Sequence, residues 1–83
     1  MKTFYCVNVE FYDNGEVKAC MTEKQAEEKP RSRRRRVPKM TAFKIWLMYK
    51  VVAEQFLAEI KNGKIPLDDV LYVYSGVRLE AAA

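Results

Sequence analysis

Alternation of apolar and polar side chains over residues 3–22 predicts a β-hairpin at the start of the chain. A three-residue loop at Asp13-Asn14-Gly15, with Gly15 in the left-handed conformation, closes this hairpin. The loop places Glu10 opposite Lys18, an attractive cross-strand pair. It also gathers one apolar face, which consists of Tyr5, Val7, Val9, Phe11, Val17, Ala19 and Met21. A two-residue Asn-Gly turn gives neither feature, so the three-residue loop is favoured.

The two cysteines fall on the opposite, polar face of this hairpin. Cys6 and Cys20 are diagonal neighbours there, roughly 7–8 Å apart by strand geometry, whereas a disulfide prefers closer Cα atoms. We therefore expect two free thiols and a reducing, cytoplasmic setting. A reactive-thiol role is an alternative, but no neighbouring residue in the sequence would obviously activate either thiol.

Residues 42–61 fit a long helix with Thr41 as its N-cap. Asn62-Gly63 supplies the stop, and Pro66 prevents continuation. At the helical period of about 3.6 residues per turn, one broad apolar stripe forms. It consists of Ile45, Trp46, Tyr49, Val52, Ala53, Phe56, Leu57 and Ile60. We expect this stripe to pack on the apolar face of the hairpin.

A second apolar group lies away from that stripe, in the first half of the predicted helix. Phe43, Leu47 and Val51 recur every four residues, with Met48 nearby. Three interpretations stay open: coverage by the basic segment or the last strand, a dimer or partner interface, and a helix on a membrane surface. These four residues are the candidate interface.

The residues after Pro66 predict a short turn and then a third strand over 70–75, rich in Val, Leu and Tyr. The expected fold class is α+β: a small ββαβ domain in which a three-stranded, mainly antiparallel sheet carries one long helix on one face. Residues 1–78 then form a single domain with a flexible basic loop at 29–39. Residues 79–83 are expected to form a disordered or cloning-derived tail.

Charge is distributed unequally along the chain. Residues 29–39 hold seven of the 15 Lys and Arg residues and none of the 11 Asp and Glu residues, so the net +4 divides into +7 here and −3 elsewhere. Pro30 and Pro38 bracket this run, which indicates an extended or flexible segment rather than a helix. Because guanidinium groups bind phosphate and stay charged, the candidate polyanion-binding residues are Arg31, Arg33, Arg34, Arg35, Arg36 and Lys39.

Catalysis finds little support in the sequence. There is no histidine, no glycine-rich phosphate loop, no cluster of metal ligands and no arrangement typical of a nucleophile. The adjacent Asp68 and Asp69 are interpreted as turn or capping residues. No apolar stretch reaches the roughly 18 residues that span a bilayer. We therefore expect a non-enzyme without a metal, a cofactor or a membrane span.

The basic segment has three interpretations: a nucleic-acid contact, a site for an acidic protein partner, or a passive solvated loop. The favoured hypothesis is a non-catalytic binding module whose arginine-rich loop contacts a nucleic-acid backbone, DNA or RNA, with little sequence specificity. The alternative is a protein–protein interaction or inhibitor-type accessory protein, of the kind that phages and mobile elements encode. It would act through an apolar helix face or as a homodimer.

Overall fold

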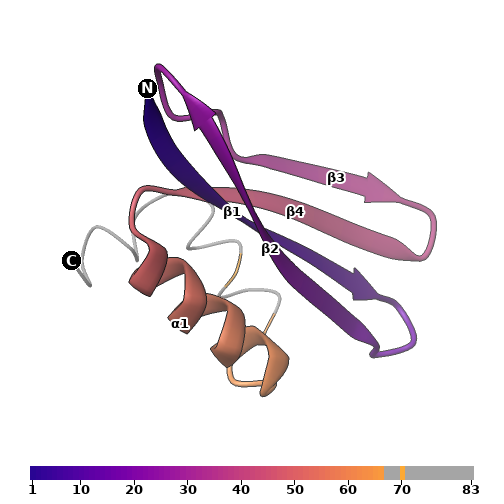
Figure 1. The fold of residues 1–83 in the computed structure, drawn as a ribbon. Helices are drawn as coiled ribbons and strands as arrows, with labels where there is room; N and C mark the ends of the chain where they lie inside the picture. Colours follow the sequence, from indigo (N-terminus) through magenta and orange to yellow (C-terminus); the bar gives the residue numbers. More distant parts are fainter. Residues whose placement is uncertain (67–69, 71–83) are drawn as a thin grey trace.

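Two antiparallel hairpins form one sheet, and the helix α1 (Lys50–Lys61) follows them (Figure 1). A computed structural model describes residues 1–66 and Val70. The first hairpin joins β1 (Lys2–Tyr12) to β2 (Val17–Ala26), and the second joins β3 (Arg33–Val37) to β4 (Met40–Leu47). Because β1 also pairs with β4, the strand order is β2-β1-β4-β3. The fold is therefore α+β, with a four-stranded antiparallel sheet and α1 packed against it.

The first hairpin has the register that the sequence predicts. Val9 pairs with Ala19, and Glu10 pairs with Lys18. Gly15 has a φ of 92°, in the left-handed region that glycine adopts without strain. Its N–H donates a hydrogen bond of 3.0 Å to the carbonyl of Tyr12. The predicted three-residue loop is therefore confirmed, together with the separation of the strands into two faces.

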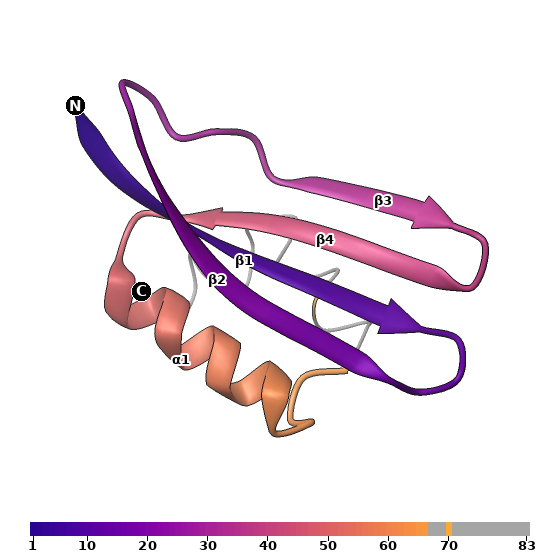
Figure 2. The same cartoon turned by 45° about the vertical axis from the view of Figure 1, so that its right-hand side comes forward.

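The core lies between one face of the sheet and α1. The helix contacts β2 and β1 more than β4, and both views show β3 at the far edge of the sheet (Figure 2). Rings of Phe11 and Phe43 meet edge to face, with centroids 6.2 Å apart. The buried core residues are Val7, Val9, Phe43, Ile45, Leu47, Ala53, Phe56, Ile60, Ile65 and Val70.

The prediction of a helix over 42–61 is wrong in its first half, where the chain forms β4. Phe43 and Leu47 are four residues apart, a spacing that fits both the helical period and the two-residue period of a strand. In β4 the odd-numbered residues of 41–47 face the core and are buried, and the even-numbered ones face the other way. Thr41 is consequently a buried strand residue and not a helix cap.

The second half of that helix is as predicted, and its end is a Schellman motif. Gly63 has a φ of 71° and donates from its N–H to the carbonyl of Ile60, while Lys64 donates to Glu59. Ala53, Phe56 and Ile60 are buried against the sheet, as the apolar stripe predicts. The helix begins only at Lys50, after a Tyr49 in extended conformation, so it spans 12 residues.

The prediction of a flexible loop over 29–39 is wrong for residues 33–37, which form β3, whereas the extended alternative is confirmed there. Arg33 pairs with Lys44, and Val37 pairs with Met40. Arginine has no strong preference for strands, so the backbone ladder with β4 fixes this conformation. Pro38 then begins the two-residue turn to β4, a position that suits its fixed φ. Over the described residues the element order is therefore ββββα, whereas ββα was expected there, before the last strand.

The expected strand over 70–75 lies outside the described residues except for Val70, and so do Asp68, Asp69 and the tail at 79–83. Val70 is buried in the core. Its N–H donates a 3.1 Å hydrogen bond to the carbonyl of Pro66, which is the i to i−4 pattern of a helix. The expected strand therefore does not begin at Val70.

The turn between β3 and β4 generates a stability prediction. Lys39 has a φ of 71°, which makes it the only described non-glycine residue in the left-handed region. An L side chain there is strained by about 1–2 kcal/mol, and glycine recovers part of this after its larger loss of backbone entropy. We expect Lys39→Gly to raise the free energy of unfolding in urea by about 0.5–1 kcal/mol. Lys39→Val should lower it, and equal stability of the two variants would contradict the argument.

Candidate polyanion-binding surface

The four consecutive arginines lie on β3, the edge strand beside β4. All four are exposed, and their side chains alternate between the two faces of the sheet. Arg33 and Arg35 share the face opposite α1, here called the open face, and Arg34 and Arg36 share the other. Arginines on one face are separated by about 6.6 Å along the strand, twice the rise per residue. The basic run is therefore two short rows of guanidinium groups, one on each face.

Arg36 is fixed in place by the first hairpin. Its Nη1 lies 3.3 Å from Oδ1 of Asp13 and donates a 2.8 Å hydrogen bond to Oγ1 of the buried Thr41. The N–H of Asp13 also donates to the carbonyl of Lys39, at 3.0 Å. The turns of both hairpins are thus tied together at one end of the sheet. Half-exposed ion pairs stabilise weakly, so Arg36 has a positioning role rather than an energetic one.

Within the described residues, the other three arginines of β3 have no carboxylate partner. In the part of the chain that the structure describes, ion pairs join Arg36 to Asp13 and Lys18 to Glu16, and none involves Arg33, Arg34 or Arg35. These three guanidinium groups are exposed and free to bind an external anion. They are the least neutralised charges of the basic run.

The open face as a whole is basic, because further lysines join the arginines there. The register places Lys44 directly opposite Arg33, on the neighbouring strand. Among the strand residues of this face, Glu10 is the single carboxylate. The cations are Lys2, Lys18, Lys24, Arg33, Arg35 and Lys44.

Sequence reasoning missed this extension of the basic surface. The sequence pattern predicts a helix at Lys44, and the position of Lys44 beside Arg33 follows only from the pairing of β3 with β4. The alternation of 41–47 was the available signal, since a strand there puts Lys44 and Ala42 on one face and Phe43 on the other.

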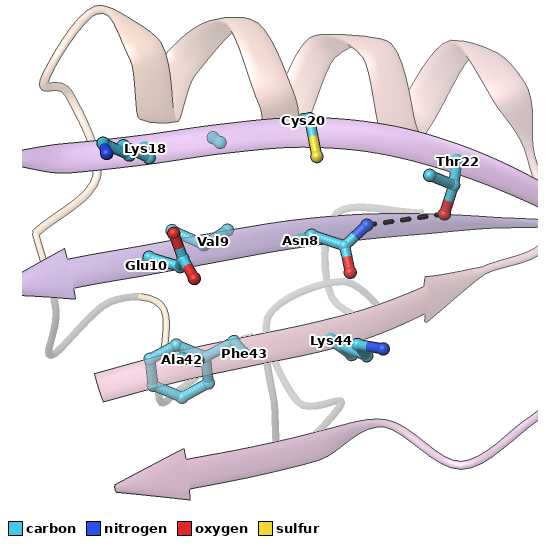
Figure 3. Close-up of a pocket in the computed structure, with 10 residues that line it drawn as sticks. Asn8, Val9, Glu10, Lys18, Cys20, Thr22, Ala42, Phe43 and Lys44 are labelled. Atoms are coloured by element: carbon cyan, nitrogen blue, oxygen red, sulfur yellow. Dashed lines mark hydrogen bonds between the residues drawn. The ribbon is translucent and has the colours of Figure 1, made fainter. Parts of the chain in front are cut away.

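A shallow hollow of about 560 Å³ lies at the centre of the open face (Figure 3). Short side chains from three strands line it, namely Asn8, Cys20, Thr22 and Ala42, and Lys18, Lys44 and Glu10 lie around them. The Nδ2 of Asn8 donates to Oγ1 of Thr22 at 3.4 Å. Because Ala42 pairs with Arg35 and Lys44 pairs with Arg33, the hollow adjoins the open-face arginines.

One end of the open face carries a small polar network. The hydroxyl of Tyr12 donates to Oε1 of Glu10 at 3.0 Å, and this bond is the main reason that the pKa of Tyr12 is raised. The Nζ of Lys18 lies 5.4 Å from the centroid of the Tyr12 ring. Tyr12 therefore already has a cation on its ring and an acceptor for its hydroxyl.

Two of the predicted binding residues lie outside β3. Arg31 is exposed in the connection between β2 and β3. Lys39 is exposed in the turn before β4, at the far end of β3 from Arg31. The six predicted residues are therefore spread along one edge of the sheet, with Arg33–Arg35 as the central group.

The four candidate interface residues do not form one stripe. Phe43 and Leu47 are buried in the core, at 1% and 6% exposure, because they lie on the helix-covered face of β4. Met48 and Val51 are exposed, at 54% and 75%. The prediction of a shared helical face is wrong, since the first two residues belong to a strand. Met48 and Val51 remain available as surface groups, together with the exposed Tyr49.

The two thiols differ in their surroundings. Cys6 and Cys20 are both free; Cys6 is buried and Cys20 is exposed beside the hollow. Burial raises the pKa of Cys6 above its ordinary value near 9.0, with Lys44 acting in the opposite direction. The Sγ of Cys6 also donates to Oδ1 of Asn8, at 3.6 Å.

We expect iodoacetamide at about pH 8 to modify Cys20 quickly and Cys6 only after unfolding, as measured by mass spectrometry with and without urea. A raised pKa also means that the folded state keeps the Cys6 proton longer than the unfolded state does. Stability from this group is present below the unfolded pKa and falls as pH rises from that value toward the folded one. The fall should be smaller in Cys6→Ala, in which the raised pKa of Tyr12 still contributes. Equal labelling of both thiols in the native protein would contradict the burial of Cys6.

No described helix is long and apolar enough to cross a membrane. No group of three or more potential metal ligands occurs among the described residues. Comparison of the chain with protein-family models, curated proteins and solved structures found no match, so the functional argument rests on the residues themselves.

Proposed function

We propose that this protein is a non-catalytic binding module that contacts the phosphate backbone of a nucleic acid through the arginines of β3. The observation that carries the proposal is the exposed, unneutralised group Arg33, Arg34 and Arg35 on an edge strand. Lys44 extends this group on the open face. Guanidinium groups form charge-assisted, bidentate hydrogen bonds with phosphate, and they stay charged at any physiological pH.

A strand is a suitable support for contacts to a repeating anion. The regular rise of β3 spaces Arg33 and Arg35 evenly, in the way that phosphates are spaced evenly along a nucleic-acid strand. Within the described residues, no side-chain hydrogen bond or ion pair holds Arg33, Arg34 or Arg35 in an orientation for base-specific contacts. The proposal is therefore backbone binding with little sequence preference.

Protection of the sheet edge is a second role for the same residues. Charged side chains on an edge strand discourage pairing with another chain. Edge protection requires charge of either sign, whereas β3 carries four guanidinium groups and no other charged side chain in Arg33–Val37. The two roles are compatible, and only the binding role predicts a measurable affinity for nucleic acid.

Replacing Arg33, Arg34 and Arg35 together with alanine should reduce the affinity for labelled nucleic acid at least about tenfold while leaving the fold intact, since all three side chains are exposed. For four phosphate contacts the log–log salt slope of the native protein should be about −3 to −3.5. The slope of the variant should be shallower by about two to three. Fluorescence anisotropy at several salt concentrations measures both quantities, and circular dichroism checks the fold.

A matched control removes the same charge elsewhere. Lys50, Lys61 and Lys64 are exposed at the ends of α1 and just after it. Their triple replacement with alanine changes the net charge by the same amount. If both triple variants lose affinity equally, general charge and not β3 accounts for the binding, and the proposal is wrong.

A second candidate function is self-association through the start of α1. Met48, Tyr49, Val51 and Val52 are exposed apolar or aromatic residues close together in sequence, at 54%, 67%, 75% and 36% exposure. Exposed apolar groups that adjoin one another are common at protein interfaces. Of the four predicted interface residues, this surface keeps Met48 and Val51, which lie outside β4.

The variant Val51→Glu tests self-association, because a carboxylate at the centre of an apolar interface is left unpaired on binding. If the protein is a homodimer through this surface, the variant should be a monomer by light scattering at concentrations where the native protein is a dimer. Its free energy of unfolding per chain should change little, since Val51 is exposed. The variant Glu54→Gln, at another exposed position of α1, serves as the control. Identical masses for the native protein and Val51→Glu would contradict this function.

A further inference from the structure

The open face contains a hollow between two lysines, in addition to the arginines that carry the proposed function. A hollow of about 560 Å³ lies between Lys18 and Lys44, and its lining includes the short side chains of Cys20 and Ala42. The volume falls within the range of about 300–1,000 Å³ found for small-ligand sites. The hollow is large enough for a nucleobase.

We propose that the nucleic acid bound by this protein is single-stranded, and that one of its bases enters this hollow while the adjoining phosphates contact Arg33 and Arg35. This inference rests on the proposed function of β3 and specifies the class of nucleic acid. The occupant is argued from the charge of the face, whose strands carry six lysines and arginines and one glutamate, and from the position of the hollow beside the arginines.

The register joins the two parts of the site. Arg35 lies directly opposite Ala42, which lines the hollow, and Arg33 lies opposite Lys44. A nucleic-acid strand whose backbone follows β3 therefore places its bases over the neighbouring strands β4 and β1, on the open face. Successive phosphates contact Arg33 and Arg35, and an unstacked base enters the hollow beside Ala42.

The hollow supplies groups that can hold a base. Lys18 and Lys44 stand on opposite sides of it, and an ammonium group near an aromatic base is attracted to the π-face. Asn8 and Glu10 supply an amide and a carboxylate that can hydrogen-bond to a base edge. Bases are available for such contacts only when they are unstacked and unpaired.

Duplex binding fits this geometry less well. The outer strands of a four-stranded sheet are about 14 Å apart at the usual strand spacing, wider than the major groove of about 12 Å that admits a two-stranded ribbon. The β3–β4 hairpin cannot act as an independent ribbon, because β4 pairs with β1 from Met40 to Leu47. The face of a four-stranded sheet instead suits an extended nucleic-acid strand with exposed bases.

The exposed thiol of Cys20 is a built-in probe of the hollow, and the buried Cys6 is an internal reference. The experiment measures the rate of Cys20 alkylation with and without a saturating mixed-sequence single-stranded oligonucleotide, as DNA and as RNA. The matching duplex is the comparison. We expect at least about fivefold slower labelling of Cys20 with the single strand and little change with the duplex.

A filling variant tests the hollow independently. Ala42→Phe places a large side chain in the hollow without removing any charge, so it should lower the affinity for the single strand by about tenfold. Ala58→Phe makes the same change at an exposed position of α1, the helix on the opposite face, and should leave the affinity unaltered. Thermal unfolding of both variants verifies the fold; if Ala42→Phe fails to fold, Ala42→Val provides the smaller substitution.

The outcomes separate this inference from the proposed function. Single-strand preference, protection of Cys20 and a selective loss in Ala42→Phe support both. Binding that depends on Arg33–Arg35 but favours the duplex, leaves Cys20 labelling unchanged and tolerates Ala42→Phe overturns the inference and retains backbone binding by β3. Absence of any binding that depends on these arginines overturns both.

Discussion

The pairing of β1 with β4 is the interaction on which the rest of the structure depends. It runs from Tyr5 to Tyr12 on one strand and from Leu47 to Met40 on the other, and it joins two hairpins into one sheet. Without it the first hairpin has an apolar face with nothing beside it, and an isolated two-stranded hairpin is marginally stable at best. With it, Phe43 and Ile45 lie beside Val9 and Val7, and the combined surface is large enough to bury one side of α1.

The same pairing determines what lies on the other side of the sheet. Because partners in a ladder point to the same face, the register that buries Phe43 also places Ala42 and Lys44 on the open face. Next to them, β3 adds Arg33 and Arg35. One alternation therefore produces an apolar face that packs against α1 and an opposite face that carries Lys44, Arg33 and Arg35. The pairing of β3 with β4 thus adds two of the four arginines of β3 to the open face and two to the other face.

The parts of the fold that could be predicted are those specified by local sequence. The register of the first hairpin follows from Gly15 and from the alternation on both strands, and the helix end follows from Gly63. Residues 42–49 could not be assigned in this way, because Phe43 and Leu47 at a spacing of four fit a helix and a strand equally. The arginines of β3 have no local strand preference at all. Their conformation depends on pairing with β4. A prediction that has a helix in place of β4 therefore contains neither β3 nor the open face. The candidate arginines were identified by composition alone, whereas Lys44 and the hollow require the register.

Because residues 33–37 form a strand and not a flexible loop, the proposed contact involves a smaller loss of entropy on binding. A disordered basic arm loses backbone and side-chain entropy when it binds, and that loss opposes association. In β3 the backbone is already ordered by its ladder with β4, and Arg36 is held by Asp13 and Thr41. The strained Lys39 keeps the turn next to this anchor, through the hydrogen bond from Asp13 to its carbonyl. Folding thus orders the backbone that carries the arginines before any ligand arrives, and only the side chains of Arg33, Arg34 and Arg35 remain to be ordered on binding.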